Sequence, residues 1–216
     1  MYDGKTLWAI FRGIAGNPDD FDEWEFNLRD KIIRTTGIPA IVFSYKTNFL
    51  TVWKNRRLRA ERAARVLKGF SDTDYRINIA AHSEGTVVAT DSLRLLGWPR
   101  VENLHLVCGA CDSDFERIGI NRALKMESLG EVHCWIAGKD TAMKFERLVL
   151  GKLLFGIPER SEPLGLHGPR NVNQEFKANV CEHWGSPWDE YGHSDCWLPQ
   201  NLNRTMLGFL NPPPRA

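Results

Sequence analysis

The stretch "INIAAHSEGTVVA" (residues 77–89) decides the fold. Four of its first five residues are apolar or small, and it then becomes polar at His82, Ser83 and Glu84. It passes through Gly85 and resumes with small and β-branched residues. The pattern predicts a buried strand that ends near residue 82, a helix that begins near residue 84, and Ser83 at the turn between them.

The same strand-and-helix unit repeats along the chain. The expected strands are 6–13, 39–45, 75–82, 103–110, 131–138 and, less clearly, 171–180. The expected helices are 19–35, 53–69, 84–97, 141–155 and 199–210. The first five strands are largely apolar rather than alternating, as in parallel sheets that are covered on both faces. The order predicts an α/β fold: a doubly wound, mainly parallel sheet of about six strands flanked by helices.

Length and composition bound the remaining possibilities. The 216 residues, 43% of them hydrophobic, can form one good core, so we expect a single domain over 1–216 with a flexible tail at 211–216. The 28 basic and 27 acidic residues give a net charge of +1, which argues against nucleic acid as a partner. There is no signal-peptide pattern and no apolar run near the roughly 20 residues of a membrane span. A cytoplasmic protein is therefore expected.

The five cysteines are irregularly spaced and do not predict a metal centre. Cys108 and Cys111 form one C-x-x-C, and Cys181 lies two residues before His183. A zinc finger needs a second pair at a regular spacing, and none follows. We therefore expect no metal and no cofactor.

Polar side chains follow several of the expected strands. In open α/β sheets, ligands bind at the carboxyl ends of the strands. Ser83 follows the third strand, Asp112 the fourth and Asp140 the fifth, and His193 lies beyond the weak sixth. A serine, an acid and a histidine thus occur in that order, each beyond the end of a strand.

Two motifs resemble those of the α/β-hydrolase superfamily. Residues 81–85 (AHSEG) resemble its nucleophile elbow, with Ala81 in place of the first glycine of G-x-S-x-G. Residues 11–21 (FRGIAGNPDDF) resemble the H-G-x-x-G loop of lipases, with Arg12 in place of the histidine. The likeness is to compact, lidless bacterial lipases and esterases. It covers 6–140 and the surroundings of His193, and implies a minimal α/β-hydrolase fold without the leading antiparallel strands.

The resemblance implies roles for individual residues. Ser83 would be the nucleophile, His193 the base and Asp140 the acid that orients it. Asp112 is the main rival for the acid. His183 and His167 are rivals for the base. The backbone N–H groups of Ile14 and Glu84 would form the oxyanion hole.

The function implied by the resemblance is that of a serine hydrolase. The most direct interpretation is a carboxylic-ester hydrolase that acts on a small-molecule ester through an acyl-enzyme. A thioesterase or amidase on the same fold is one alternative, and a non-catalytic binding module is another. The acyl length, the leaving group and the oligomeric state are not readable from the sequence.

The sequence allows two interpretations of each of several further features. Arg12 and Glu84 either pair, and so hold the two oxyanion loops together, or both reach solvent. Residues 54–65 carry six basic residues and one acid, as a solvated helix face does, with an anionic surface or substrate as the alternative. Residues 148–158 are either helix core or an apolar flap. The aromatic residues Trp184, Trp188 and Tyr191 either line a substrate pocket or pack a long loop.

Overall fold

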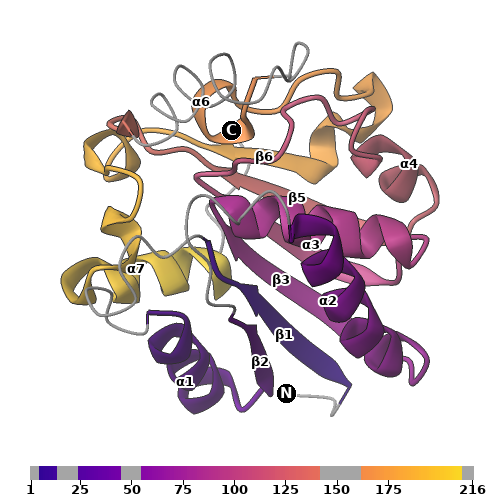
Figure 1. The fold of residues 1–216 in the computed structure, drawn as a ribbon. Coiled ribbons are helices and arrows are strands. Elements are labelled where there is room, and N and C mark those ends of the chain that lie inside the picture. Colours follow the sequence, from indigo (N-terminus) through magenta and orange to yellow (C-terminus); the bar gives the residue numbers. More distant parts are fainter. Residues whose placement is uncertain (1–4, 14–23, 45–54, 142–161, 211–216) are drawn as a thin grey trace.

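The computed structural model describes residues 5–13, 24–44, 55–141 and 162–210. Its centre is a six-stranded sheet in the order β2-β1-β3-β4-β5-β6, and all the neighbouring strands are parallel (Figure 1). The strands are β1 (Thr6–Phe11), β2 (Ala40–Phe43), β3 (Arg76–His82), β4 (Val101–Val107), β5 (Leu129–Trp135) and β6 (Val180–His183). Because every strand runs the same way, their carboxyl ends meet at one edge of the sheet.

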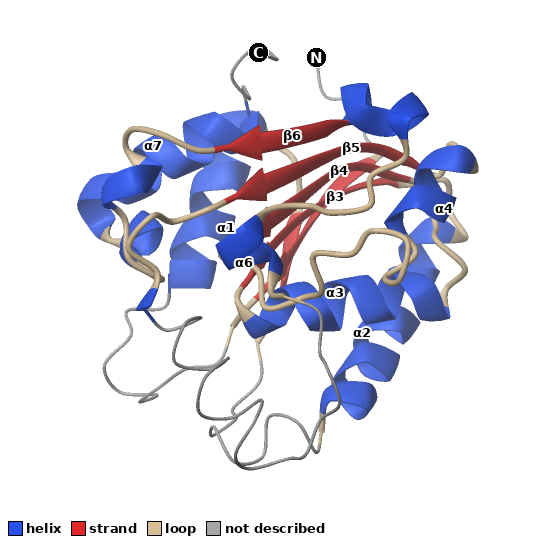
Figure 2. Cartoon of the chain, turned by 90° about the horizontal axis from the view of Figure 1, so that it is seen from above, coloured by secondary structure: helices blue, strands red, loops and turns tan. Residues whose placement is uncertain are grey.

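Helices cover both faces of this sheet (Figure 2). The helices α1 and α7 lie on one face, and α2, α3 and α4 lie on the other. Their bounds are α1 (Trp24–Thr36), α2 (Arg56–Ser71), α3 (Glu84–Leu95), α4 (Ile120–Lys125) and α7 (Pro199–Leu210). The shorter elements are α6 (Leu164–His167), η2 (Gln174–Asn179), η3 (Trp188–Glu190) and η4 (Asp195–Trp197). The fold is therefore the doubly wound α/β fold that the sequence predicts.

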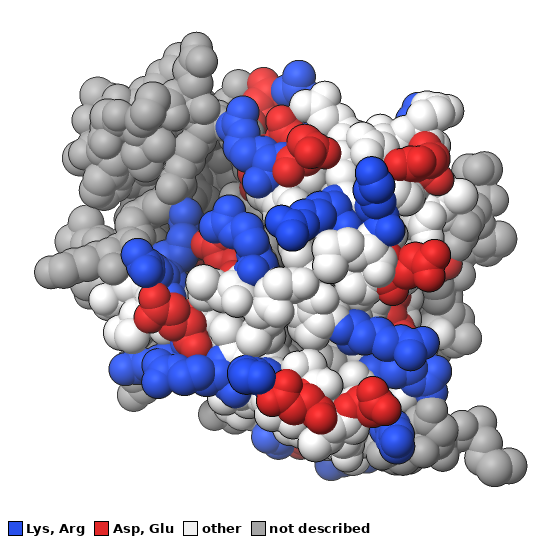
Figure 3. Space-filling view, turned by 90° about the vertical axis from the view of Figure 1, so that its right-hand side faces the viewer, with Lys and Arg blue, Asp and Glu red and all other residues white. Residues whose placement is uncertain are grey.

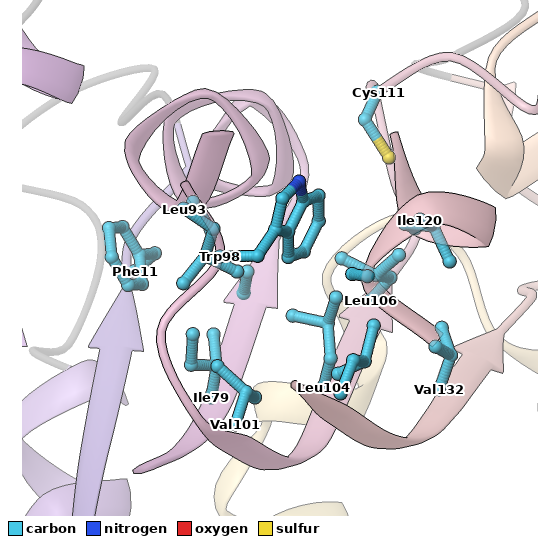
Figure 4. Close-up of a cluster of buried hydrophobic side chains, with 14 of the residues drawn as sticks. Phe11, Ile79, Leu93, Trp98, Val101, Leu104, Leu106, Cys111, Ile120 and Val132 are labelled. Atoms are coloured by element: carbon cyan, nitrogen blue, oxygen red, sulfur yellow. The ribbon is translucent and has the colours of Figure 1, made fainter. Parts of the chain in front are cut away.

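One hydrophobic core lies between the sheet and the helices α2, α3 and α4. Ile79, Leu104 and Val132 come from three neighbouring strands, and Leu93 of α3 packs over them (Figure 4). All four side chains are fully buried. Alternate residues of a strand point to the same face, which is why these positions form one layer.

A second core lies on the opposite face and is rich in aromatic residues. Leu28 and Ile32 of α1 pack there with Trp8 of β1, and α7 adds Leu202 and Phe209. Trp24 of α1 stacks on Trp197 with ring centroids 4.0 Å apart, which is a bulky, rigid contact. The residues on either side of His193 in the chain, Tyr191 and Cys196, belong to this core.

Five of the six expected strands occur where the sequence predicts them, within a few residues at each end. The sixth expectation, 171–180, is wrong. Residues 174–179 form the 3-10 helix η2, and β6 begins at Val180, in register with Val132 of β5. The polar side chains of Gln174, Glu175 and Lys177 do not suit a strand in this sheet. The predicted helix 141–155 beyond its first residue, the segment 148–158 and the tail 211–216 lie outside the described residues.

The described part of the chain contains no helix with both the length and the apolar character that a bilayer crossing requires. On the face shown in Figure 3, Lys and Arg side chains are interspersed with Asp and Glu. A mixed surface of this kind does not provide the large basic patch that a polyanion would need.

Candidate active site

Ser83 occupies a sharp turn between β3 and α3. Its backbone has φ 54° and ψ −128°, a left-handed conformation that a residue with a Cβ rarely adopts. Hydrogen bonds hold it there: the Ser83 N–H donates to Val107 O at 3.0 Å, and the Ser83 carbonyl accepts from Thr86 N at 3.0 Å and from Ala110 N at 3.2 Å. The neighbouring strand and the first turn of α3 together maintain the strained conformation of the serine.

Two glycines allow other backbone segments to approach this turn closely. A Cβ at Gly85 would lie 2.5 Å from Phe11 O and 2.6 Å from Arg12 O, so only a glycine lets α3 lie against the end of β1. A Cβ at Gly13 would lie 2.8 Å from Ser83 Cβ. The loop after β1 and the serine turn are therefore in direct contact.

His193 and Asp140 form a hydrogen-bonded pair. The Nδ1 atom of His193 lies 2.8 Å from Oδ2 of Asp140, and the aspartate side chain is fully buried, whereas that of His193 is 17% exposed. Asp140 follows β5, and His193 lies in the segment between η3 and η4, 53 residues further along the chain. A buried carboxylate bonded to Nδ1 fixes the ring so that Nε2 is left for another partner.

His82 anchors the segment that carries His193. Its Nε2 lies 2.8 Å from the backbone carbonyl of His193, and the two ring centroids are 4.8 Å apart. Burial, helped by the nearby His193, lowers the pKa of His82 from 6.5 to about 3. A neutral His82 donates Nε2–H to that carbonyl. Because Ser83 is the next residue, this bond brings the serine turn and the His193 segment together.

The rival residues have other partners. Asp112 accepts a hydrogen bond from Asp114 N at 2.7 Å and pairs with Arg117 at 3.3 Å. His183 lies 3.1 Å from Nδ1 of His133, and His167 of α6 faces Glu162 at 3.6 Å. Of the candidate acids and histidines, Asp140 and His193 are the two that the structure brings together.

Both alternatives for Arg12 and Glu84 are wrong, because each residue is largely buried and pairs with a residue of a different helix. Arg12 pairs with Glu25 of α1 at 2.8 Å. Glu84 accepts two hydrogen bonds from Arg56 of α2, at 2.6 and 2.8 Å. Arg56 lies in the basic stretch interpreted as a solvated face, yet its side chain is only 15% exposed. Nothing in the spacing of that stretch distinguishes Arg56 from its exposed neighbours.

The Arg56–Glu84 pair affects the electrostatics of the serine turn. The Glu84 side chain is 1% exposed, and the residue is the first of α3. Its backbone N–H has no acceptor within the helix, so it can donate to a bound anion. The bidentate contact with Arg56 compensates the negative charge of the Glu84 carboxylate. Ile14, the second expected oxyanion donor, lies outside the described residues.

The aromatic residues expected near a pocket differ in burial. Trp188 and Tyr191 are 6% and 7% exposed, lie in edge-to-face contact, and belong to the aromatic core. Trp184 is 52% exposed and donates Nε1–H to Glu182 at 2.9 Å. Burial gives Trp188 and Tyr191 a packing role, and their role in substrate binding stays a prediction.

Two further features are a group of potential metal ligands next to the serine turn and an open hollow elsewhere on the chain. Near the serine turn, ligand atoms of His82, Cys108 and His193 all lie within 4.8 Å of one another, so this site has donors that a soft metal ion could bind. Elsewhere, an open hollow of about 690 Å³ is lined by η2, by Asn171 and by Asp114. None of Ser83, Asp140 or His193 lines it, so it contributes nothing to the candidate active site.

The six-stranded parallel sheet, with helices on both faces, places the chain among the doubly wound α/β proteins. No protein-family model matches the chain. No curated protein matches it either. Among solved structures, it is similar to a cutinase-like protein from Cryptococcus sp., at 12% identity and a TM-score of 0.46, over 95% of this chain and 93% of the other. Likeness at that level defines neither a family nor an activity.

Proposed function

We propose that the chain is a serine hydrolase that cleaves carboxylic esters through an acyl-enzyme. The observation that carries this proposal is the 2.8 Å contact between His193 Nδ1 and the buried Asp140, in a segment anchored by the neighbour of Ser83. A strained serine at a helix N-terminus, next in the chain to the histidine that holds the His193 segment, fits the arrangement that acyl transfer requires.

The proposed reaction assigns one step to each group. Nε2 of His193 takes the proton from Ser83 Oγ while the oxygen attacks the ester carbonyl carbon. Asp140 accepts the Nδ1–H bond and stabilises the imidazolium that forms. The imidazolium then protonates the leaving alcohol as the C–O bond breaks, which leaves an acyl-serine. Water, activated by the same imidazole, hydrolyses that ester and returns Ser83.

Stabilisation of the oxyanion is proposed for backbone donors. The N–H of Glu84 lies at the start of α3, where the helix dipole favours negative charge. The loop after β1, which contacts the serine turn at Gly13, would supply the N–H of Ile14. Each such donor typically contributes about 3 kcal/mol to transition-state stabilisation. The Arg56 contact keeps the Glu84 carboxylate from opposing this charge.

We also propose a cytoplasmic location for the chain, with which its five cysteines are compatible. All the cysteines are free, and four of them are buried. Free thiols persist in reducing compartments, whereas oxidising ones favour disulfides.

Active-site labelling tests the proposal. A fluorophosphonate probe should react with the wild-type chain and with Ser71→Ala, a control at a partly exposed serine, and should miss Ser83→Ala. In ester hydrolysis, Ser83→Ala and His193→Ala should each abolish nearly all turnover, and the double variant should lose little more because the residues act as a unit. No labelling of Ser83, or full activity of His193→Ala, would refute the assignment.

A p-nitrophenyl ester series of increasing chain length, run beside thioester and amide substrates, identifies the reaction class. We expect the highest kcat/KM on an ester. Preference for a thioester or an amide would replace the ester assignment with one of the other two on the same Ser83 nucleophile. Absence of both labelling and turnover would favour a binding module. Labelling of Ser83 without turnover would mean that the substrate belongs to none of the three classes tested.

A further inference from the structure

A second group of metal-binding side chains lies away from the serine turn, on the strands β5 and β6. Glu131 and His133 are two residues apart in β5, so they point to the same face of the sheet. His133 is directly opposite Cys181 in the parallel register of β5 with β6. Ligand atoms of the three residues all lie within 4.8 Å of one another. Figure 1 shows these two strands side by side at the end of the sheet.

The three ligand types match one class of ion. A carboxylate, an imidazole and a thiol together suit Zn²⁺, which accepts oxygen, nitrogen and sulfur donors in a tetrahedral arrangement. The donors of such a site are separated by about 3.5 Å, given metal–ligand bonds of about 2.0–2.3 Å. His133 Nε2 and Glu131 Oε2 are already 3.3 Å apart. Small rotations of the Cys181 and Glu131 side chains would complete the set.

Burial differs among the three residues in a way that permits an ion to enter. The His133 side chain is fully buried, whereas that of Glu131 is 32% exposed and Cys181 is partly exposed. An ion can therefore reach the imidazole from the side of Glu131 and Cys181. Water from solvent on that side would be the fourth ligand of a tetrahedral ion.

The orientation of His133 is set by groups behind it. Its Nδ1 lies 3.1 Å from Nε2 of His183, and its ring stacks between those of His105 and His183, with centroids 4.6 and 5.4 Å away. A second hydrogen bond on the far ring nitrogen is the usual support of a metal-bound histidine. This arrangement directs Nε2 of His133 toward Glu131.

We propose that Glu131, His133 and Cys181 form a zinc site that joins the edge strand β6 to β5. Binding replaces the S–H bond of Cys181 with a Zn–S bond and releases the proton to solvent. The β6 strand has only four residues and, among the described strands, pairs with β5 alone, so a metal bridge to β5 stabilises its position. The site does not use the residues of the candidate active site.

Zinc titration of the metal-free, reduced chain tests this proposal. Calorimetry should show one strong site in the wild type, and Zn²⁺ should raise its Tm. In Cys181→Ser and Glu131→Gln, the affinity should fall by more than about 100-fold, beyond the loss typical of an outer-shell change. Glu182→Gln is the matched control, since Glu182 is next to Cys181 on the opposite face of β6, and it should bind as the wild type does.

Cobalt substitution adds a direct signature of the sulfur ligand. Co²⁺ bound to the wild type should show a thiolate charge-transfer band, which Cys181→Ser should lose while Glu182→Gln keeps it. No binding in the wild type, or wild-type affinity in Cys181→Ser, would overturn the proposal. Loss of binding in His193→Asn with retention in Cys181→Ser would also overturn it, because the ion would then occupy the cluster beside Ser83. Ser83→Ala should bind zinc normally whether or not the chain hydrolyses esters.

Discussion

Removal of Arg56 should destabilise the chain through the carboxylate that it leaves behind. The Glu84 side chain is 1% exposed and accepts both hydrogen bonds of a bidentate contact. Removal of one partner from a buried pair typically costs about 3–5 kcal/mol. The N-terminus of α3 offsets about 0.3–1 kcal/mol, because its dipole favours the negative charge. Arg56 is itself 15% exposed, and water can enter the vacated space. We therefore expect Arg56→Met to lower the free energy of unfolding by about 3 kcal/mol.

Urea unfolding measures this loss. With a slope of about 2–3 kcal/mol per molar, the midpoint should fall by about 1–1.5 M. The matched control is Arg57→Met, because Arg57 is 89% exposed and pairs with Glu61 at the helix surface. An exposed pair of that kind is worth about 0–1 kcal/mol. Glu84→Gln should be milder than Arg56→Met, and the double variant should recover part of the loss.

Two results would refute the reasoning. One is an Arg56→Met variant no less stable than Arg57→Met. The other is a double-mutant cycle with a coupling energy within error of zero. If the proposed ester hydrolysis holds, kcat should also fall in Arg56→Met, because the uncompensated Glu84 carboxylate would oppose the developing oxyanion. Glu84→Gln should keep or raise kcat.

Three further predictions concern single positions near the serine turn. The pKa of His82 is about 3 in the fold, against 6.5 for a free histidine. The unfolded chain therefore binds a proton at His82 below pH 6.5 that the folded chain does not bind, so the free energy of unfolding is highest above pH 6.5 and falls as the pH drops toward 3. In that window, the unfolding free energy of the wild type should fall more steeply than that of His82→Gln, by up to about 1.4 kcal/mol per pH unit, and equal slopes would contradict the burial argument. Asp140→Asn should reduce kcat by about 10²–10⁴-fold and Asp112→Asn only mildly, and the reverse order would make Asp112 the acid. Gly85→Ala should be strongly destabilising, because its Cβ would lie 2.5 Å from a backbone oxygen. The control Gly69→Ala, which has open space around it, should raise the urea midpoint slightly. A tolerated Gly85→Ala would show that α3 can move away from β1.

The sequence was most informative where the physical cause is local. The change from apolar to polar residues at His82, followed by Gly85, predicts the strand end, the serine turn and the start of α3, and all three occur there. The glycine marks the turn in the sequence because a Cβ at position 85 would lie 2.5 and 2.6 Å from two backbone oxygens. The sixth strand was predicted too early in the chain, because β6 has only four residues and the polar residues of η2 immediately before it were included in the expected strand.

The partners of charged residues were not predictable in the same way. Arg12 follows β1 and Glu84 begins α3, and the sequence left open whether they pair with each other or reach solvent. In the fold, Arg12 forms an ion pair with Glu25 at the start of α1, and Glu84 forms one with Arg56 at the start of α2. Both partners come from helices whose positions depend on the packing of the whole domain. Burial of Arg56 therefore becomes visible only when α2 is placed against α3.

The proposed zinc ligands were not predictable from the sequence either. Metal motifs are recognised in sequences by short, regular spacing, and His133 and Cys181 are 48 positions apart in the chain. They meet because β6 adds to the sheet beside β5 with Cys181 opposite His133, and a shift of one residue would turn Cys181 to the other face. A short polar strand such as β6 has a register that its own sequence specifies weakly. A metal bridge between Cys181 and His133 would specify that register, so loss of zinc should loosen β6 before any other strand of the sheet.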